Sequence, residues 1–197
     1  MAPLVKRLNG TVGIRSVVCV TAQHRQMLDS VMEQFNIHAD YDLNLMHAGQ
    51  TLTSITTGVL DGLDRVLQEV KPDVTLVHGD TTTSTGAALE SFYHQVAVGH
   101  VEAGLRSYDR YSPFPEEMNR ELTSRIATLH FAPTTRSRDN LAKEGIIQGV
   151  HVVGNTVIDA LQQMVHNRYV FHSQELRNLP LEEGRWIVMT AHRREDL

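Results

Sequence analysis

Three short segments of the chain each place a carboxylate where a strand is expected to end. They are VTLVHGD (74–80), VAVGHVEAG (96–104) and SPFPEEMNRE (112–121). Ligands of open parallel α/β sheets bind outside the carboxyl ends of the strands, so Asp80, Glu102 and either Glu116 or Glu117 are expected to converge on one crevice. Carboxylates gathered in a partly dry site have their pKa values pushed apart, which suits acid–base chemistry near neutral pH.

Histidines accompany two of these carboxylates. His78 and Asp80 are two residues apart, as are His100 and Glu102, so each pair shares one side of a strand. Four such groups could bind a metal, but the spacing matches no HExxH motif and no cysteine joins them. We therefore favour buried histidines that are satisfied by hydrogen bonds.

Other polar residues lie close to the same strand ends. HGDTTTS (78–84) could bind an anion such as phosphate at a helix N-terminus, or its Asp80 and threonines could only cap the helix. Arg106 could contact a carboxylate or an anionic ligand, and the alternative is a solvated surface arginine. Glu116 and Arg120 are spaced as an i,i+4 pair, which could simply stabilise a helix.

A further loop, TAQHRQ (21–26), follows the first apolar run of the chain. Gln23, His24 and Gln26 would be its polar side chains, and the plain alternative is a capped helix start.

Strand and helix patterns alternate along the chain, which predicts βαβ units. Apolar residues at helical spacing, or short β-branched runs, define each expected element. Expected strands are 16–21, 74–79, 96–101, 129–132 and 150–153. Expected helices are 24–35, 51–70, 82–93, 116–128, 135–144 and 156–166, with a further helix beginning directly at Ala2. Regular alternation of this kind predicts an α/β fold with a doubly wound parallel sheet that is Rossmann-like.

The last part of the chain changes character. Residues 167–184 are polar and contain Pro180 and Gly184, so they are expected to form a linker. WIVMTAH (186–192) follows and predicts a buried strand, with Trp186 as a core residue.

Composition excludes several classes of protein. The 197 residues are 41% hydrophobic and 21% charged, with a net charge of −5 and no basic block, which argues against nucleic-acid binding. No apolar stretch reaches the roughly 18 residues that a membrane-spanning helix needs, and no signal-peptide pattern is present. Cys19 stands alone in an apolar run, which indicates a buried, inert thiol and a cytoplasmic protein.

Taken together, seven motifs in this order closely resemble the non-hydrolysing UDP-N-acetylglucosamine 2-epimerases. They are TAQHRQML, VHGDTTTS, GHVEAGLRS, YSPFPEEMNR, HFAPTTRSRDNL, VVGNTVIDAL and TAHRRE. The resemblance implies two Rossmann-like domains in a glycosyltransferase-B arrangement and a homodimer. It also implies interconversion of UDP-N-acetylglucosamine and UDP-N-acetylmannosamine with no cofactor, by loss of the C2 proton and UDP, through a 2-acetamidoglucal, and their re-addition.

The resemblance also implies roles for individual residues. Asp80, Glu102 and Glu116 match the catalytic carboxylates. Arg120 matches an active-site arginine that holds carboxylate or diphosphate, and His192 matches a histidine that contacts the diphosphate. The polar residues of the first loop match a possible effector site for a second UDP-N-acetylglucosamine in some members; they are Gln23, His24 and Gln26.

Family members begin with a strand and a glycine-containing loop and continue through a second domain, and neither is evident in this sequence. We therefore expect residues 1–166 to form an N-terminal Rossmann-like domain without its first strand, 167–184 to form a linker, and 185–197 to begin a nucleotide-binding domain. This polypeptide alone is expected to have little activity and marginal stability. The alternatives are a non-catalytic protein that pairs with family members, and a hydrolysing relative that releases N-acetylmannosamine.

Overall fold

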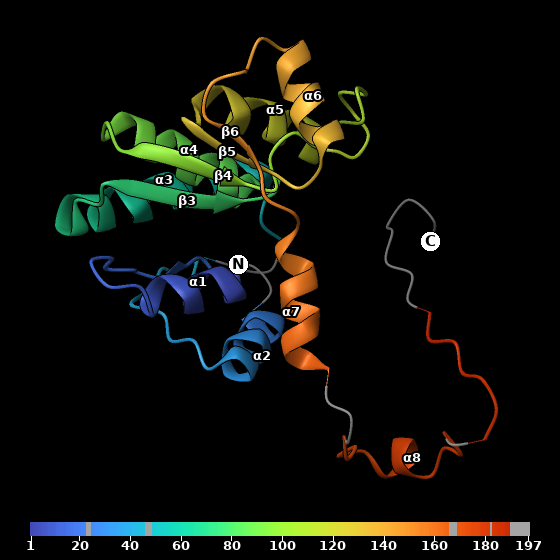
Figure 1. Cartoon of the computed structure of the whole chain (residues 1–197). Helices are drawn as coiled ribbons and strands as arrows, with labels where there is room; N and C mark the ends of the chain where they lie inside the picture. Colours follow the sequence, from blue (N-terminus) through green and yellow to red (C-terminus); the bar gives the residue numbers. More distant parts are fainter. Residues whose placement is uncertain (23–24, 46–48, 166–168, 182, 190–197) are drawn as a thin grey trace. The chain divides into compact units, whose positions relative to one another are not determined.

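The computed structural model describes the chain except for residues 23–24, 46–48, 166–168, 182 and 190–197. Two compact units are present, Met1–Gln163 and Met164–Leu197. The first unit carries the sheets and nearly all of the helices (Figure 1).

A four-stranded parallel sheet forms the centre of the first unit (Figure 1). Its strands, in spatial order, are β3 (Val74–His78), β4 (Ala97–Val101), β5 (Leu129–Ala132) and β6 (Val150–Val152). The register places Val77 beside His100 and His100 beside His130. Because all four strands run in the same direction, the loops after β3, β4 and β6 meet at one edge of the sheet.

A second, two-stranded sheet is separate from the first. It consists of β1 (Cys19–Val20) and β2 (Tyr41–Asp42), which pair in parallel. β3 is an edge strand, and within the described residues no strand pairs with its outer side. β1 is shorter than the predicted strand 16–21, and β2 was not predicted.

Helix α3 (Leu52–Val70) packs against the two-stranded sheet. Its buried residues Val59, Leu63 and Val66 form a core with partly buried apolar side chains, among them Cys19 and Tyr41. Burial raises the pKa of the Cys19 thiol to about 11, with a smaller contribution from Asp42, which agrees with an unreactive cysteine.

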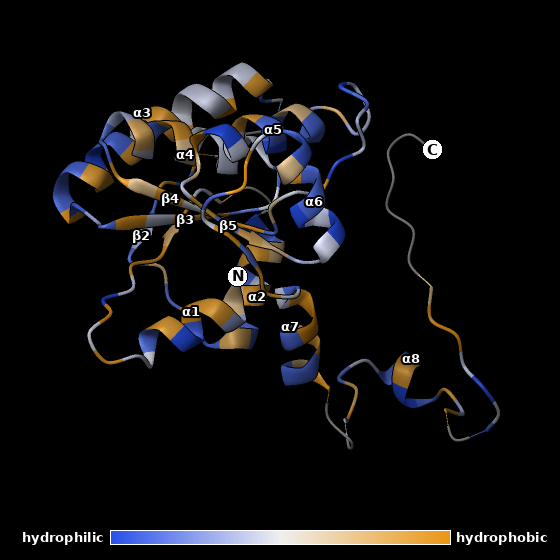
Figure 2. Cartoon of the chain, turned by 45° about the horizontal axis from the view of Figure 1, so that its top comes forward, coloured by the Kyte–Doolittle hydropathy of each residue, from blue (hydrophilic) through white to orange (hydrophobic). Residues whose placement is uncertain are grey.

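The other described helices of this unit complete its fold. They are α1 (Ala2–Asn9), α2 (Arg25–Phe35), α4 (Thr82–Tyr93), α5 (Glu116–Ile126), α6 (Thr135–Lys143) and α7 (Thr156–Met164). α4 packs against both α3 and α5, and α6 packs against β5 and β6. Figure 2 shows predominantly hydrophobic strands between these helices. The predicted α/β class with a parallel, Rossmann-like sheet is confirmed.

The second unit differs from its prediction in two ways. A short helix, α8 (Gln174–Arg177), lies inside the expected linker. The described residues 186–189 form no strand and are exposed, with Ile187 at 92% and Trp186 at 49%. Trp186 donates a hydrogen bond from Nε1 to the Pro180 carbonyl at 3.3 Å. The predictions of a buried strand and a core tryptophan are therefore wrong for these four residues, because no apolar surface among the described residues of this unit covers them.

Candidate active site

Asp80 lies in the turn that follows β3, directly before α4. Thr81 is the N-cap of α4 and accepts a hydrogen bond from the Ser84 N–H at 3.2 Å, while Ser84 Oγ donates to the His78 carbonyl at 2.6 Å. These bonds tie the end of the strand to the first turn of the helix. They fix the turn from which the Asp80 carboxylate projects.

Glu102 lies at the equivalent place after β4, the neighbouring strand. Its backbone has φ of 68°, a left-handed conformation that costs a non-glycine residue about 1–3 kcal/mol and is often found at functional sites. The turn continues through Gly104, where a Cβ atom would lie 2.2 Å from the Ser137 carbonyl oxygen, so only glycine fits against α6. The close packing of this turn on α6 holds Glu102 in its strained conformation.

The Glu102 carboxylate has two polar neighbours. Asn155 Nδ2 donates to Oε1 at 2.7 Å, and His78 Nε2 lies 3.8 Å from Oε2. Asn155 follows β6, so the sheet joins residues that are 53 positions apart in the sequence. No role of Asn155 was predicted; the only signal in the sequence is its place after a predicted strand, within the motif VVGNTVIDAL.

Arg120 links Asp80 to α5. Its Nη2 donates to Asp80 Oδ2 at 2.6 Å, and its Nη1 lies 3.3 Å from Glu117 Oε2. Glu117 is completely buried and accepts hydrogen bonds from the backbone N–H groups of Ser107 and Tyr108. Glu117 therefore anchors both Arg120 and the loop before α5, while Glu116 occupies the first position of that helix.

The electrostatics of Asp80 show that the charges of Glu116 and Glu102 act on its carboxylate. Burial raises the pKa of Asp80, the Arg120 charge and hydrogen bond lower it, and the charges of Glu116 and Glu102 raise it again, so that the pKa lies above its ordinary value. Asp80 therefore retains a proton to higher pH than a free aspartic acid. A carboxyl group with this property, beside another carboxylate in a different hydrogen-bonding environment, can take part in proton transfer.

Both histidines near the site have lowered pKa values, which favour the neutral form near pH 7. His100 is fully buried, its Nε2 lies 2.8 Å from the Gly79 carbonyl, and burial lowers its pKa to about 4. Burial, followed by the charge of the Met1 amine, also lowers the pKa of His78. The Nε2 contact holds the Gly79 peptide in place, whereas His100 Nδ1 is buried without a hydrogen-bond partner among the described residues, so the predicted hydrogen bonding is met at one ring nitrogen only.

Arg106 is placed differently from the other predicted residues. Its side chain is 0% exposed, and its Nε and Nη2 donate to the two Glu144 oxygens at 2.7 and 2.8 Å. Nη2 also bonds Ser124 and Nη1 bonds the Leu105 carbonyl. The alternative of a solvated surface arginine is wrong, and these contacts give no support to a role in substrate binding.

The remaining predicted residues contribute little to the described site. Gln26 is exposed on α2. Gln23, His24 and His192 lie outside the described residues, so their predicted roles stay predictions.

Fold and candidate site together define a Rossmann-like α/β protein with a cluster of carboxylates at the carboxyl edge of its parallel sheet. The model of the UDP-N-acetylglucosamine 2-epimerase family matches residues 6–197. The chain belongs to the UDP-N-acetylglucosamine 2-epimerase family.

Curated relatives and solved structures give the same result. The UDP-N-acetylglucosamine 2-epimerase of Bacillus subtilis is 52% identical over 198 residues, which cover 100% of this chain and 51% of that protein. The crystal structure of the Neisseria meningitidis UDP-GlcNAc 2-epimerase bound to UDP-GlcNAc is 54% identical, with a TM-score of 0.81 over 83% of this chain and 44% of that one. The Methanocaldococcus jannaschii UDP-GlcNAc 2-epimerase, in complex with UDP-GlcNAc and UDP, is 39% identical, with a TM-score of 0.76 over 82% of this chain and 44% of that one. The chain spans about half the length of the curated relatives it matches.

Among the described residues, no helix combines the length and the apolar character needed to cross a membrane.

Proposed function

We propose that this chain provides the proton-transfer site of a non-hydrolysing UDP-N-acetylglucosamine 2-epimerase. The observation that carries the proposal is the pair of carboxylates on neighbouring strand ends, Asp80 bonded to Arg120 and Glu102 bonded to Asn155. The substrate is suggested by the family and by the Neisseria meningitidis structure, which is bound to UDP-GlcNAc.

The proposed reaction requires groups on two faces of the sugar ring. One carboxylate removes the C2 proton while the C1–oxygen bond breaks and UDP departs, which leaves a C1=C2 double bond in 2-acetamidoglucal. A second group then returns a proton to the other face of C2 as a UDP oxygen forms the new bond to C1. The reaction has no net oxidation, so the chain needs to supply only acids, bases and positive charge.

Asp80 and Glu102 are suited to act as two separate acid–base groups because their hydrogen-bond partners differ. Asp80 has a raised pKa and a cationic partner, whereas Glu102 accepts a neutral amide hydrogen bond. Neighbouring strands are about 4.8 Å apart, so carboxylates at their ends can approach one ring carbon from two sides. Glu116 is proposed as the third acid–base group and His192 as a diphosphate contact, on the family resemblance. The homodimer stays a prediction on the same ground.

The test uses a chimera in which these 197 residues replace the matching half of the Bacillus subtilis relative. The chimera is incubated with UDP-N-acetylglucosamine in heavy water and followed by NMR. We expect deuterium at C2 and formation of UDP-N-acetylmannosamine. Accumulation of UDP and free N-acetylmannosamine would instead identify a hydrolysing enzyme. Substrate binding without deuterium at C2 would favour the non-catalytic alternative and contradict the proposal.

A further inference from the structure

A second cluster of ionisable side chains lies at the other end of α4. Asp64 comes from α3, and Glu90 and His94 come from the last turn of α4 and its C-cap. His94 Nε2 is 2.9 Å from Asp64 Oδ1 and 3.2 Å from Glu90 Oε1. One ligand atom of each residue lies within 4.8 Å of the other two.

Two of the three distances among these atoms, both from His94 Nε2, are close to the edge of a metal tetrahedron, and the third lies within 4.8 Å. Zinc binds imidazole nitrogen at about 2.0–2.1 Å and carboxylate oxygen at about 2.0–2.2 Å, which places neighbouring ligand atoms about 3.4 Å apart. The distances from His94 Nε2 to Asp64 Oδ1 and to Glu90 Oε1 are 2.9 and 3.2 Å, which are shorter than this value by a few tenths of an ångström. Glu90 and His94 are four residues apart and share one helix face, so a small rotation of side chains opens the space for an ion.

Burial and charge also favour a cation here. The Glu90 side chain is 9% exposed and that of His94 is 22% exposed, whereas that of Asp64 is 45% exposed, so the cluster is withdrawn from water on its Glu90 side only. Two carboxylates converge on one ring nitrogen, and a divalent ion would neutralise both. Glu90 and His94 also lie at the carboxyl-terminal end of α4, where the helix dipole favours positive charge.

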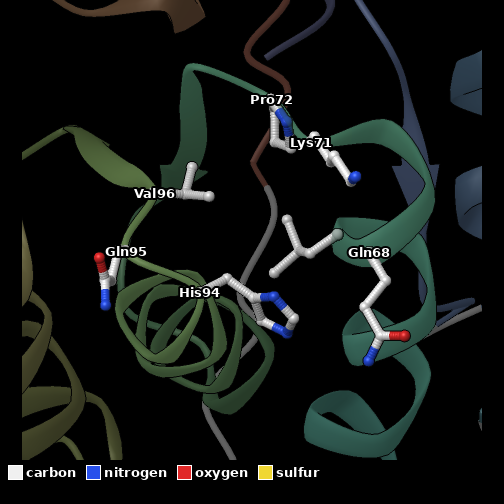
Figure 3. Close-up of a pocket in the computed structure, with 7 residues that line it drawn as sticks. Gln68, Lys71, Pro72, His94, Gln95 and Val96 are labelled. Carbon is white, nitrogen blue, oxygen red and sulfur yellow. The ribbon is translucent and has the colours of Figure 1, made fainter.

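A neighbouring side chain orients one of the ligands. Gln68 Nε2 donates to Asp64 Oδ1 at 2.8 Å, an outer contact of the kind that fixes metal-binding carboxylates. Figure 3 shows the His94 ring reaching from α4 toward Gln68 on α3, at the wall of a groove of about 630 Å³. His94 and Gln68 line this groove, so solvent reaches the cluster from the His94 side.

We propose that Asp64, Glu90 and His94 bind a divalent transition-metal ion of the Zn²⁺ class, which ties α3 to α4. An imidazole ligand favours such ions over Mg²⁺ or Ca²⁺, which take oxygen ligands. α4 has 12 residues and is about 18 Å long, so this site is separated from Asp80 by the length of the helix. The ion is therefore a structural link and takes no part in the sugar chemistry.

The proposal is tested by titrating the metal-free chain with ZnCl₂ in a calorimeter and by thermal unfolding with Zn²⁺ or with EDTA. We expect one equivalent of Zn²⁺ to bind. We also expect the unfolding temperature of the chain to be higher with Zn²⁺ than with EDTA. His94→Gln and Glu90→Gln should each weaken this binding at least tenfold, since each removes a ligand. Gln68→Ala keeps all three ligands and should weaken binding about 10–100-fold, as outer contacts do.

The matched control is His38→Gln, which removes an exposed histidine outside the cluster. It should leave the Zn²⁺ affinity unchanged. The proposal is overturned if His38→Gln and His94→Gln weaken binding equally. It is also overturned if Zn²⁺ and EDTA give the same unfolding temperature, which would leave the cluster as a hydrogen-bonded ion pair only.

Discussion

The two ends of α4 use the same kinds of side chain in different ways. At its amino-terminal end, Asp80 bonds Arg120 while Glu102 bonds Asn155, so each carboxylate has its own partner. At its carboxyl-terminal end, Asp64 and Glu90 share the single nitrogen of His94. Separate partners create unequal carboxylates, which proton transfer needs, whereas a shared partner creates a convergent set of atoms, which suits one small ion.

The largest expected effect tests the amino-terminal end through Glu102. In the chimera, Glu102→Gln should lower the rate of deuterium entry at C2 by about 10²–10⁴-fold, because a positioned acid–base group contributes that much. The amide can still accept the Asn155 hydrogen bond, so the unfolding temperature should change little. Equal loss of activity and of folding would show that Glu102 is structural.

A second way to sharpen the comparison is to remove the positive charge of Arg120 from the amino-terminal end of α4. Arg120→Met should lower the free energy of unfolding by about 3–5 kcal/mol, since it leaves the completely buried Glu117 without its positive partner. Urea denaturation measures the change. Arg138→Met is the control, because its pair with Asp139 is half-exposed and should contribute less than about 1 kcal/mol. Equal losses in the two variants would contradict a stabilising role for Arg120.

The pH dependence of stability tests the neutral histidine at the amino-terminal end. His100 has a pKa of about 4 in the folded chain and an ordinary value of 6.5. Below pH 6.5 the unfolded chain binds the proton first, so the His100 contribution to stability falls as the pH drops from 6.5 to 4 and is constant above that range. The loss should be roughly 3 kcal/mol.

Urea denaturation at pH 7 and pH 4 measures this loss. His100→Gln should remove it, and His38→Gln should retain it. A pH dependence that is identical in the wild type and in His100→Gln would show that other groups cause the whole effect.

The smallest expected effect concerns the cap that holds Asp80 beside α4. Thr81→Ala removes the bond to the Ser84 N–H and should lower the free energy of unfolding by about 1 kcal/mol. Thr57→Ala, at an exposed position inside α3, should change it by less than about 0.5 kcal/mol. A larger effect at Thr57 than at Thr81 would contradict the assigned cap.

Local patterns in the sequence predicted most of the fold. Helical spacing located α3 to within one residue, and the apolar run 129–132 coincides with β5. The prediction was poorer for β1, because two paired residues are too few for a periodic pattern. It was also poorer for residues 186–189, because their burial needs surfaces that the local sequence does not reveal.

Residues of the site could be predicted only where a chemically suitable residue type follows the end of a predicted strand. Asp80 and Glu102 follow two neighbouring strands, so their place was readable from the sequence. Asn155 reaches Glu102 across 53 positions, and Arg106 reaches Glu144 across 38, so only the folded chain reveals these partners. The metal cluster was missed for the same reason, since Asp64 and His94 are 30 positions apart.

The most direct test of the account measures deuterium entry at C2 of UDP-N-acetylglucosamine for three forms of the chimera in parallel: unmodified, Glu102→Gln and Glu90→Gln. The account predicts rapid exchange in the unmodified form, a loss of about 10²–10⁴-fold in Glu102→Gln, and unchanged exchange in Glu90→Gln. Full exchange in Glu102→Gln, or an equal loss in both variants, would contradict the assignment of proton transfer to the amino-terminal end of α4.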